Sequence, residues 1–480
     1  MDKFEKKYRC LKKDGSNIKI KVLLAFPNTG ADAKGYSVNP PIPFLYLASC
    51  IKDYSVAIYD QRTDPPDVFE KLLKEGPICV GLTCMTGKQI QYALELAEIA
   101  KARGIPTVFG GIHPSLLPEQ TQADYRVDFV IAGEGEIAFR ELLESLEKGE
   151  SMNPVVYGER MDLNELSTQP YEHLDVEQYV HVHQLPGRHL SYMFSRGCPS
   201  ACTYCANPAL YHQKWRIRNI DDCLNELFSL VEKYNITAVS FFDESLAISP
   251  RIFNELIQKI DSKFIWRFQA KIRDLKKHDL GLVYQNGGRF VGCGLESGSP
   301  RILKEIKKGQ TVEDYILVNK QLAKSGMEVG YNYIMGFPGE TMDDLKMTLN
   351  LALRMLDENP NAYNNTFYLL SPYPGTEIAQ KMISFMPNTL AEWAQFDRHN
   401  VNADRYSAEE KELFGRIMFS SKFTGKKLMR TFPDNTELRD LSADMTARWR
   451  EFSFFDDKDW EQLTNRGLKM LKDLFGENAY

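Results

Sequence analysis

The sequence has no excess of basic residues, because 59 Lys and Arg stand against 65 Asp and Glu and give a formal charge of −6 over 480 residues. That balance argues against a strongly basic nucleic-acid surface. Long apolar runs are also missing. The longest nearly uncharged apolar stretch near the N-terminus, residues 41–51, is too short to cross a bilayer and contains prolines. We therefore expect no nucleic-acid partner and no membrane span.

We also expect no signal peptide and no disulfide framework. The first ten residues, MDKFEKKYRC, are charged and lack the apolar core of a signal peptide, which predicts a cytoplasmic protein. Nine cysteines are too few and too scattered for a disulfide framework, so in a reducing compartment they are thiols, metal ligands or small apolar groups. The composition, 43% hydrophobic and 26% charged, is that of an ordinary globular protein.

Residues 1–150 alternate strand-like and helix-like patterns. Strands are expected at 18–27, 55–60, 78–84, 106–111 and 128–135, and helices at 67–75, 88–103 and 136–147. Continuous apolar strands that alternate with amphipathic helices predict a parallel sheet covered on both faces. Right-handed crossovers make this an α/β, Rossmann-like layer.

The rest of the chain divides into three further parts. Residues 151–188 lack the alternation and contain three prolines, which indicates a linker with partial structure. A second alternating series, over residues 189–376, has strands expected at 191–194, 237–242, 265–269, 290–295, 329–335 and 366–370. About six βα units predict a partial, TIM-like barrel. Residues 377–480 have a mostly helical, charged and aromatic pattern, which predicts a helical C-terminal region.

Three cysteines lie close together just after the first strand of the second series. The segment SRGCPSACTYCAN places Cys198, Cys202 and Cys205 in a C-x3-C-x2-C spacing that can surround one soft metal centre. A structural zinc site is the alternative, but it normally takes four ligands, often from paired cysteine motifs, and here His212 would have to be the fourth. An iron–sulfur cubane prefers four thiolates, so three cysteines leave one iron open to another ligand.

This spacing, after the first strand of a six-unit βα series, resembles the radical S-adenosylmethionine (SAM) superfamily. The resemblance implies an enzyme in which Cys198, Cys202 and Cys205 hold a [4Fe-4S] cluster. It also implies that the open iron chelates the amino and carboxylate groups of SAM. An electron from the cluster then cleaves SAM to methionine and a 5′-deoxyadenosyl radical.

Three further motifs end strands of the predicted barrel, where parallel α/β folds carry their chemistry. They are FFDESL, GLESGS and MGFPGE. Each is weak alone, because an acidic residue at a strand end is more often a helix cap, and GFPGE alone is a turn before a helix. By the same resemblance, SAM is contacted by Tyr204, Glu244, Glu296, Ser297 and Gly336.

The first domain has no G-x-G-x-x-G after its first strand, so the NAD fingerprint is absent. Its glycines lie in FGGIHP and AGEGE, after the fourth and fifth strands, where glycine lets a large flat ligand approach the backbone. Together with PPIPFLYLA, these segments resemble the cobalamin-binding domain that precedes many radical SAM domains. The resemblance implies cobalamin contacts from Thr83, Thr86, Gly110, Gly111, His113, Gly133, Glu134 and Gly135.

One departure concerns the cobalt ligand. Many cobalamin proteins carry D-x-H-x-x-G, whose histidine ligates cobalt, whereas this chain has Asp32-Ala33-Lys34-Gly35 with no histidine in phase. We therefore expect cobalamin without a protein histidine on cobalt. His113 follows a different strand and is expected to be a loop or tail contact, or a turn residue. A domain that has lost the cofactor is the alternative.

The two resemblances together imply a B12-dependent methyltransferase. The radical takes a hydrogen atom from an unactivated carbon of a small biosynthetic intermediate, and methylcobalamin supplies the methyl group to a carbon or phosphorus centre. Cyclisation, oxidation or aminocarboxypropyl transfer without methylation are alternatives within the family. A non-catalytic corrinoid carrier or sensor is an alternative of another class. The expected partners are a small-molecule substrate and a reductant such as flavodoxin or ferredoxin.

Overall fold

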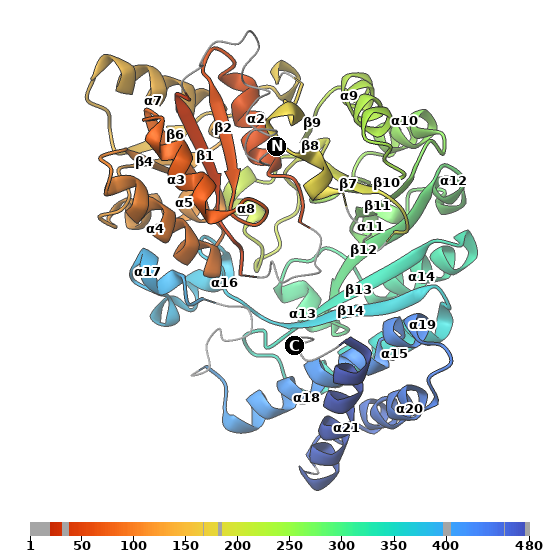
Figure 1. The fold of residues 1–480 in the computed structure, drawn as a ribbon. Helices are drawn as coiled ribbons and strands as arrows, with labels where there is room; N and C mark the ends of the chain where they lie inside the picture. Colours follow the sequence, from red (N-terminus) through yellow and green to blue (C-terminus); the bar gives the residue numbers. More distant parts are fainter. Residues whose placement is uncertain are drawn as a thin grey trace. The chain divides into compact units, whose positions relative to one another are not determined.

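The computed structural model describes residues 20–30, 38–166, 168–180, 185–396, 405–455 and 457–475. The chain divides into two compact units. The first unit comprises residues 1–199, 205–243 and 372–397, and the second comprises residues 200–204, 244–371 and 398–480. Figure 1 follows the chain from red at the N-terminus to blue at the C-terminus.

A six-stranded parallel sheet lies at the centre of the first unit, in the order β2-β1-β3-β4-β5-β6. Its strands are β1 (Val22–Phe26), β2 (Val56–Asp60), β3 (Cys79–Thr83), β4 (Thr107–Gly110), β5 (Phe129–Gly133) and β6 (Val155–Gly158). The central strands β1 and β3 are apolar and almost entirely buried. Burial on both faces is what a parallel sheet requires, and it explains why these strands read as continuous apolar runs.

Helices flank this sheet, as Figure 1 shows. They are α2 (Ile42–Cys50), α3 (Pro66–Lys74), α4 (Lys88–Lys101), α5 (Ile112–Leu116), α6 (Pro118–Gln122) and α7 (Glu136–Lys148). Helix α3 is typical: it begins with a proline and buries Val68, Phe69, Leu72 and Leu73 along one face. The predicted Rossmann-like layer is confirmed.

The sixth strand is a feature that the sequence analysis missed. Strand β6 lies in the segment interpreted as a linker, and it pairs in parallel with β5. Its side chains are half-buried or exposed, so it lacks the apolar run of a central strand. The described residues that follow β6 in that segment include three short 3₁₀ turns, at Leu163–Glu165, Tyr171–His173 and Val176–Tyr179.

A second parallel sheet has the order β14-β13-β12-β11-β10-β7. Its strands are β7 (His189–Tyr192), β10 (Ala238–Phe241), β11 (Ile265–Gln269), β12 (Gly288–Glu296), β13 (Glu328–Met335) and β14 (Ala362–Leu369). Each overlaps a strand expected from the sequence, and the sheet order follows the chain order, as a partial barrel requires. A short antiparallel pair, β8 (Ser195–Arg196) and β9 (Arg216–Ile217), was not predicted.

Helices separate the strands of this second series. They are α8 (Asn207–Tyr211), α9 (Ile220–Lys233), α10 (Pro250–Ile260), α11 (Ile272–Leu275), α12 (Leu280–Gln285), α13 (Pro300–Glu305), α14 (Val312–Ser325) and α15 (Met342–Glu358). Helix α15 begins with a capping box, in which the Thr341 and Asp344 side chains bond each other's backbone N–H groups. This cap fixes the loop after β13.

The C-terminal region is helical, as expected. Its helices are α16 (Glu377–Gln380), α17 (Leu390–Trp393), α18 (Ala408–Thr424), α19 (Lys427–Thr431), α20 (Thr436–Glu451) and α21 (Asp457–Phe475). Phe423, Leu438, Leu441, Met445 and Met470 form a shared apolar core. Within the described ranges, no helix is long and apolar enough to cross a membrane. The domain boundaries expected from the sequence stay predictions.

Candidate functional site

The three predicted cluster cysteines follow strand β8, and none of them is in a disulfide. Cys202 is buried, and Cys198 and Cys205 are half-buried. The first unit contains Cys198 and Cys205, whereas the second contains Cys202. Among the described residues, no group of three or more His, Cys, Asp or Glu side chains is arranged to hold a metal ion. The assignment of these thiols as cluster ligands therefore stays a prediction from their spacing.

Two contacts within the second unit fix the loop around Cys202. The Thr203 N–H donates to the carbonyl of Ile306 over 3.0 Å. The Lys271 ammonium, two residues beyond the end of β11, donates to Cys202 Sγ at 3.4 Å and to the carbonyl oxygen of Lys308 at 3.0 Å. Sequence reasoning missed Lys271, although its place just after a barrel strand was a signal for it.

Tyr204 and Glu296, both predicted SAM contacts, are hydrogen-bonded to each other. The Tyr204 hydroxyl donates to Glu296 Oε1 at 2.9 Å. Lys308 Nζ lies 2.6 Å from the same carboxylate oxygen and 3.0 Å from the Tyr204 hydroxyl, and sequence reasoning missed this lysine too. Glu296 is 6% exposed and Lys308 is 5% exposed, so they form a buried ion pair.

The backbone at Glu296 supports a functional interpretation of this pair. Its φ of 68° lies in the left-handed region, which residues other than glycine rarely adopt. Strained residues of this kind persist where surrounding contacts hold them, and they cluster at binding sites. The Tyr204 ring also meets Phe337 of the GFPGE motif edge-on, with 5.9 Å between ring centroids. The Cys202 loop, the end of β12 and the loop after β13 thus come together in the second unit.

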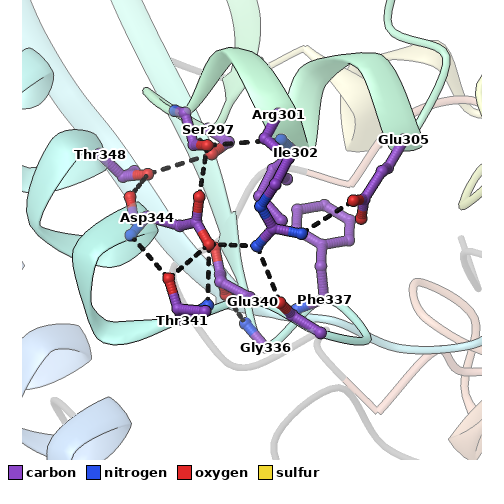
Figure 2. Close-up of polar contacts among 12 residues, drawn as sticks. Ser297, Arg301, Ile302, Glu305, Gly336, Phe337, Glu340, Thr341, Asp344 and Thr348 are labelled. Carbon is purple, nitrogen blue, oxygen red and sulfur yellow. Dashed lines mark hydrogen bonds and ion pairs between the residues drawn. The ribbon is translucent and has the colours of Figure 1, made fainter.

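Ser297, the next predicted SAM contact, is fully buried at the start of the turn after β12. Its hydroxyl lies 3.2 Å from Thr348 Oγ1 of α15 (Figure 2). The Thr348 hydroxyl also accepts the Gly298 N–H at 3.0 Å. These bonds tie the GLESGS turn to α15. The Ser297 side chain therefore helps to fix the shape of the turn, and its contact to SAM stays a prediction.

Asp344 joins the same turn to the loop after β13 (Figure 2). It accepts hydrogen bonds from Ser299 Oγ at 2.5 Å and from the Thr341 N–H at 2.9 Å, and it is ion-paired with Arg301. Burial alone would raise the pKa of Asp344, but these partners outweigh it and hold the pKa well below its usual range. The carboxylate therefore stays charged and cross-links two strand-end loops.

Gly336 is held on both sides of its peptide unit. Its N–H donates to Glu340 Oε2 at 2.5 Å, and its carbonyl accepts from Arg405 and from the Tyr406 hydroxyl, the latter at 2.8 Å. Its φ of 78° requires glycine, and a Cβ here would lie 2.3 Å from the Tyr406 hydroxyl. Burial raises the pKa of Glu340 to about 7, against the backbone hydrogen bonds that lower it.

Asp243 and Glu244, the two acidic residues after β10, differ in their surroundings. Asp243 is buried and accepts the backbone N–H groups of Phe194 at 3.1 Å and Ser195 at 2.6 Å. It therefore fixes the chain that leads from β7 to the cysteine motif. Glu244 is half-buried directly after Asp243, and its contact to SAM stays a prediction.

The predicted cobalamin residues of the first unit lie at the carboxyl ends of β3, β4 and β5. Gly110 ends β4, and Gly111 follows with a φ of 94°. A Cβ at Gly111 would lie only 2.3 Å from Thr83 Oγ1 at the end of β3, so no side chain fits there. Gly133 ends β5 with a φ of 93°, and Gly135 stands just before α7. Bare backbone at these strand ends fits the close approach of a large flat ligand.

His113 is completely buried. Its Nδ1 lies 3.0 Å from the Thr86 hydroxyl, and its ring packs against Trp393 of α17 with 5.5 Å between ring centroids. Burial lowers the pKa of His113 to about 4, so its imidazole is neutral at pH 7. Its Nε2 is buried without a hydrogen-bond partner among the described residues. His113 therefore holds Thr86 in place, and its own contact to cobalamin stays a prediction.

Glu134 forms a charge network with the segment around the cysteine motif, and its contact to cobalamin stays a prediction. Arg196 Nη1 lies 3.4 Å from Glu134, and Arg196 Nη2 lies 2.5 Å from Glu136 at the start of α7. Arg216 also pairs with Glu134. Arg196 and both carboxylates are nearly buried, so these pairs fix the GEGE turn to the β8 segment within the first unit.

The sequence matches two families in the order that the fold suggests. Residues 29–143 match the B12 binding domain, and residues 192–352 match the Radical SAM superfamily. The chain belongs to the radical SAM enzymes that carry a B12-binding domain.

Alignments with similar proteins cover most of this radical SAM enzyme. An uncharacterized methyltransferase of Pyrococcus horikoshii is 27% identical over 76% of this chain and 83% of its own. The bacteriochlorophyllide d C-12(1)-methyltransferase of Chlorobaculum tepidum is 25% identical over 80% of this chain and 81% of its own. The anaerobic magnesium-protoporphyrin IX monomethyl ester cyclase of Rubrivivax gelatinosus is 25% identical over 76% and 70%.

The fold of the enzyme is that of a solved relative. The cobalamin-dependent SAM radical enzyme OxsB, with aqua-cobalamin bound, superposes with a TM-score of 0.68 at 16% identity, over 95% of this chain and 81% of its own. The two matched domains imply a [4Fe-4S] cluster, SAM and cobalamin as the cofactors of this enzyme. The expectation that no histidine ligates cobalt stays a prediction, because residues 32–35 lie outside the described residues.

Proposed function

We propose that this radical SAM enzyme transfers a methyl group to an unactivated carbon, or to a phosphorus centre, of a small biosynthetic intermediate. The observation that carries the proposal is the pairing of a B12-binding domain with a radical SAM domain in a chain whose relatives include named methyltransferases. When bound, the cluster and SAM supply an electron and a carbon radical, and cobalamin supplies a transferable methyl group.

We assign the residues of this chain to three binding roles. The [4Fe-4S] cluster is ligated by Cys198, Cys202 and Cys205. SAM is contacted by Tyr204, Glu244, Glu296, Ser297 and Gly336. Cobalamin is contacted by Thr83, Thr86, Gly110, Gly111, His113, Gly133, Glu134 and Gly135. The donor chemistry supports each set: thiolates suit iron, the hydroxyl, carboxylate and bare glycine backbone suit a nucleoside, and the crowded glycines suit a corrin.

The remaining contacts orient these groups. The buried Glu296–Lys308 ion pair holds the Tyr204 hydroxyl in place, and Asp344 and Glu340 hold the two strand-end loops. Preorganised polar groups of this kind position a reactive group and replace water around it.

Cyclisation or oxidation without methyl transfer is the second candidate. The similarity to the anaerobic cyclase of Rubrivivax gelatinosus favours it, since that relative matches about as well as the bacteriochlorophyllide methyltransferase. A corrinoid carrier is less supported, because a carrier needs no radical SAM domain.

Product analysis tests these candidates. The enzyme is reconstituted anaerobically with iron, sulfide and hydroxocobalamin, then given SAM, titanium(III) citrate and a panel that includes the chlorophyllide-type substrates of the relatives. We expect a methylated product together with both S-adenosylhomocysteine and 5′-deoxyadenosine. Formation of 5′-deoxyadenosine and an altered substrate, with no S-adenosylhomocysteine, would establish cyclisation or oxidation. Bound corrin without cleavage of SAM would establish a carrier.

We also propose reduced flavodoxin or ferredoxin as the electron donor, since the cluster needs a one-electron reductant of low potential. The expected cytoplasmic location stays a prediction. Replacing Cys202 by Ala is the matched control for the product assay, and we expect it to abolish cluster iron and deoxyadenosine formation together.

A further inference from the structure

A lysine ammonium contacts the thiol that the sequence assigns to the cluster. Lys271 Nζ lies 3.4 Å from Cys202 Sγ and 3.0 Å from the carbonyl oxygen of Lys308. The carbonyl anchors the far end of a flexible side chain, so the ammonium is held against the sulfur. The Thr203 N–H fixes the sulfur's own loop to Ile306. Both partners of the contact are therefore positioned by backbone bonds.

The charges around this contact favour an electrostatic role for Lys271. The neighbouring cation, Lys308, is ion-paired with Glu296 over 2.6 Å, and the Lys271 ammonium also attracts the buried carboxylate of Asp274. Cys202 is only 6% exposed, and poor solvation strengthens the effect of a nearby charge. Lys271 thus places a positive charge and an N–H donor on a shielded sulfur.

Hydrogen bonds to cluster sulfurs and nearby charge set the reduction potentials of iron–sulfur clusters. One-electron reduction adds a negative charge that is spread over iron and sulfur. A cation that donates to a ligand sulfur stabilises this reduced state more than the oxidised state, and it therefore raises the potential.

We propose that Lys271 raises the one-electron reduction potential of the [4Fe-4S] cluster through its hydrogen bond to Cys202. The proposal rests on the proposed function, because it needs Cys202 to be a cluster ligand. The cluster gains one electron from the reductant, which is reduced flavodoxin or ferredoxin in our proposal and dithionite in the experiment. No covalent bond is formed or broken in that step, and Lys271 keeps its proton.

Potentiometric titration followed by electron paramagnetic resonance tests the proposal on the full-length, cluster-loaded enzyme without SAM. We expect Lys271→Met to lower the ratio of reduced to oxidised cluster at a fixed potential by about tenfold, which for one electron is about 59 mV. Lys271→Gln keeps a donor without the charge and should fall between wild type and Lys271→Met. Lys271→Arg keeps both and should titrate as wild type. A potential that is the same in all four proteins overturns the proposal.

Lys276→Met is the matched control, because Lys276 lies five residues away, is exposed and pairs with Asp314 at 2.8 Å. We expect the cluster of Lys276→Met to have the potential of wild type. If Lys276→Met shifts the potential as much as Lys271→Met does, the loss of one positive charge anywhere explains the shift, and the proposal is overturned. If Lys271→Met does not assemble a cluster, the comparison of Lys271→Gln with Lys271→Arg decides in the same way.

Two further measurements separate the possible failures. If Cys202→Ala retains its iron and sulfide, the ligand assignment fails and the proposal falls with it. If Cys202→Ala loses the cluster while the Lys271 variants keep an unchanged potential, only the inference about Lys271 fails. A loss of SAM affinity in Lys271→Met with an unchanged potential would make Lys271 a SAM contact and would likewise overturn the proposal.

Discussion

Glu340 links the charge of one residue to the shape of the loop after β13. Its carboxylate accepts the N–H groups of Gly336 at 2.5 Å and Phe337 at 3.3 Å, yet burial raises its pKa from 4.5 to about 7. Between these two values the folded protein binds a proton that the unfolded chain has released. Stability therefore falls as pH rises through this window.

We expect Glu340→Gln to remove that pH dependence. Relative to the variant, wild type should lose on the order of 1–3 kcal/mol of unfolding free energy between about pH 5 and about pH 8. Urea unfolding followed by circular dichroism at both pH values measures the difference. Glu305→Gln is the control, because that carboxylate is exposed on α13. Parallel pH profiles for wild type and Glu340→Gln would contradict the prediction.

Substitutions at two glycines of the same motif, Gly336 and Gly339, can distinguish the cost of backbone strain from the cost of a steric clash. Gly336 and Gly339 have φ values of 78° and 74°, but a Cβ at Gly336 meets the Tyr406 hydroxyl at 2.3 Å, whereas a Cβ at Gly339 meets nothing within 4 Å. We expect Gly339→Ala to cost about 1 kcal/mol and Gly336→Ala about 1–3 kcal/mol more. Urea unfolding compares the two variants. Equal costs would mean that Tyr406 moves aside freely.

At the scale of elements, a buried ion-pair network fixes the start of α7 to strand β8. Arg196 is 11% exposed and pairs with Glu134 and Glu136, which are 10% and 5% exposed. Removing one partner of a buried pair leaves an uncompensated charge, so we expect Arg196→Met to cost about 3–5 kcal/mol. A double-mutant cycle with Glu136→Gln should return a coupling energy above about 1 kcal/mol.

The matched control for this cycle is the exposed pair Arg103–Glu70, whose side chains are 35% and 42% exposed. Its coupling should stay below about 1 kcal/mol, because solvent screens exposed ions. If the coupling energy of the Arg196 cycle is no larger than that of the control cycle, the ion-pair network does not stabilise the contact between α7 and β8.

The elements that could be predicted are those whose side chains are buried in a regular pattern. Strand β11 was placed at its observed bounds, because fully buried and more exposed side chains alternate along it. The central strands of the first sheet were found because they are continuous apolar runs. Strands β6, β8 and β9 were missed. Strand β6 is an edge strand with half-exposed side chains, and β8 and β9 have two residues each, too few to show any period.

At the scale of the whole molecule, motif residues could be identified from the sequence, but their partners could not. Cys202, Tyr204, Glu296 and Gly336 stand in recognisable local patterns. Lys271 is 69 residues from Cys202, and Lys308 is 104 residues from Tyr204. A single sequence carries no record of contacts over such separations, because they arise only when barrel strands bring their ends together. The burial of His113 escaped prediction because Trp393 is contributed by a distant helix.

The two-domain construction predicts that the cofactors load independently. Gly111 and Gly104 both have positive φ, but a Cβ at Gly111 lies 2.3 Å from Thr83 Oγ1, whereas a Cβ at Gly104 meets nothing within 4 Å. We expect Gly111→Ala to weaken hydroxocobalamin binding by at least about tenfold, which corresponds to about 1.4 kcal/mol, and Gly104→Ala to leave it unchanged. Both variants should keep the iron and sulfide of wild type.

Cys202→Ala is the reciprocal variant, and we expect it to lose iron and sulfide while it binds hydroxocobalamin as wild type does. Absorbance titration measures the corrin, and colorimetric assays measure iron and sulfide, on the same anaerobic samples. Loss of both cofactors from either variant would mean that the sites assemble as one. The glycine-lined strand ends and the cysteine motif would then form a single folding unit, although they lie in segments that match two different families.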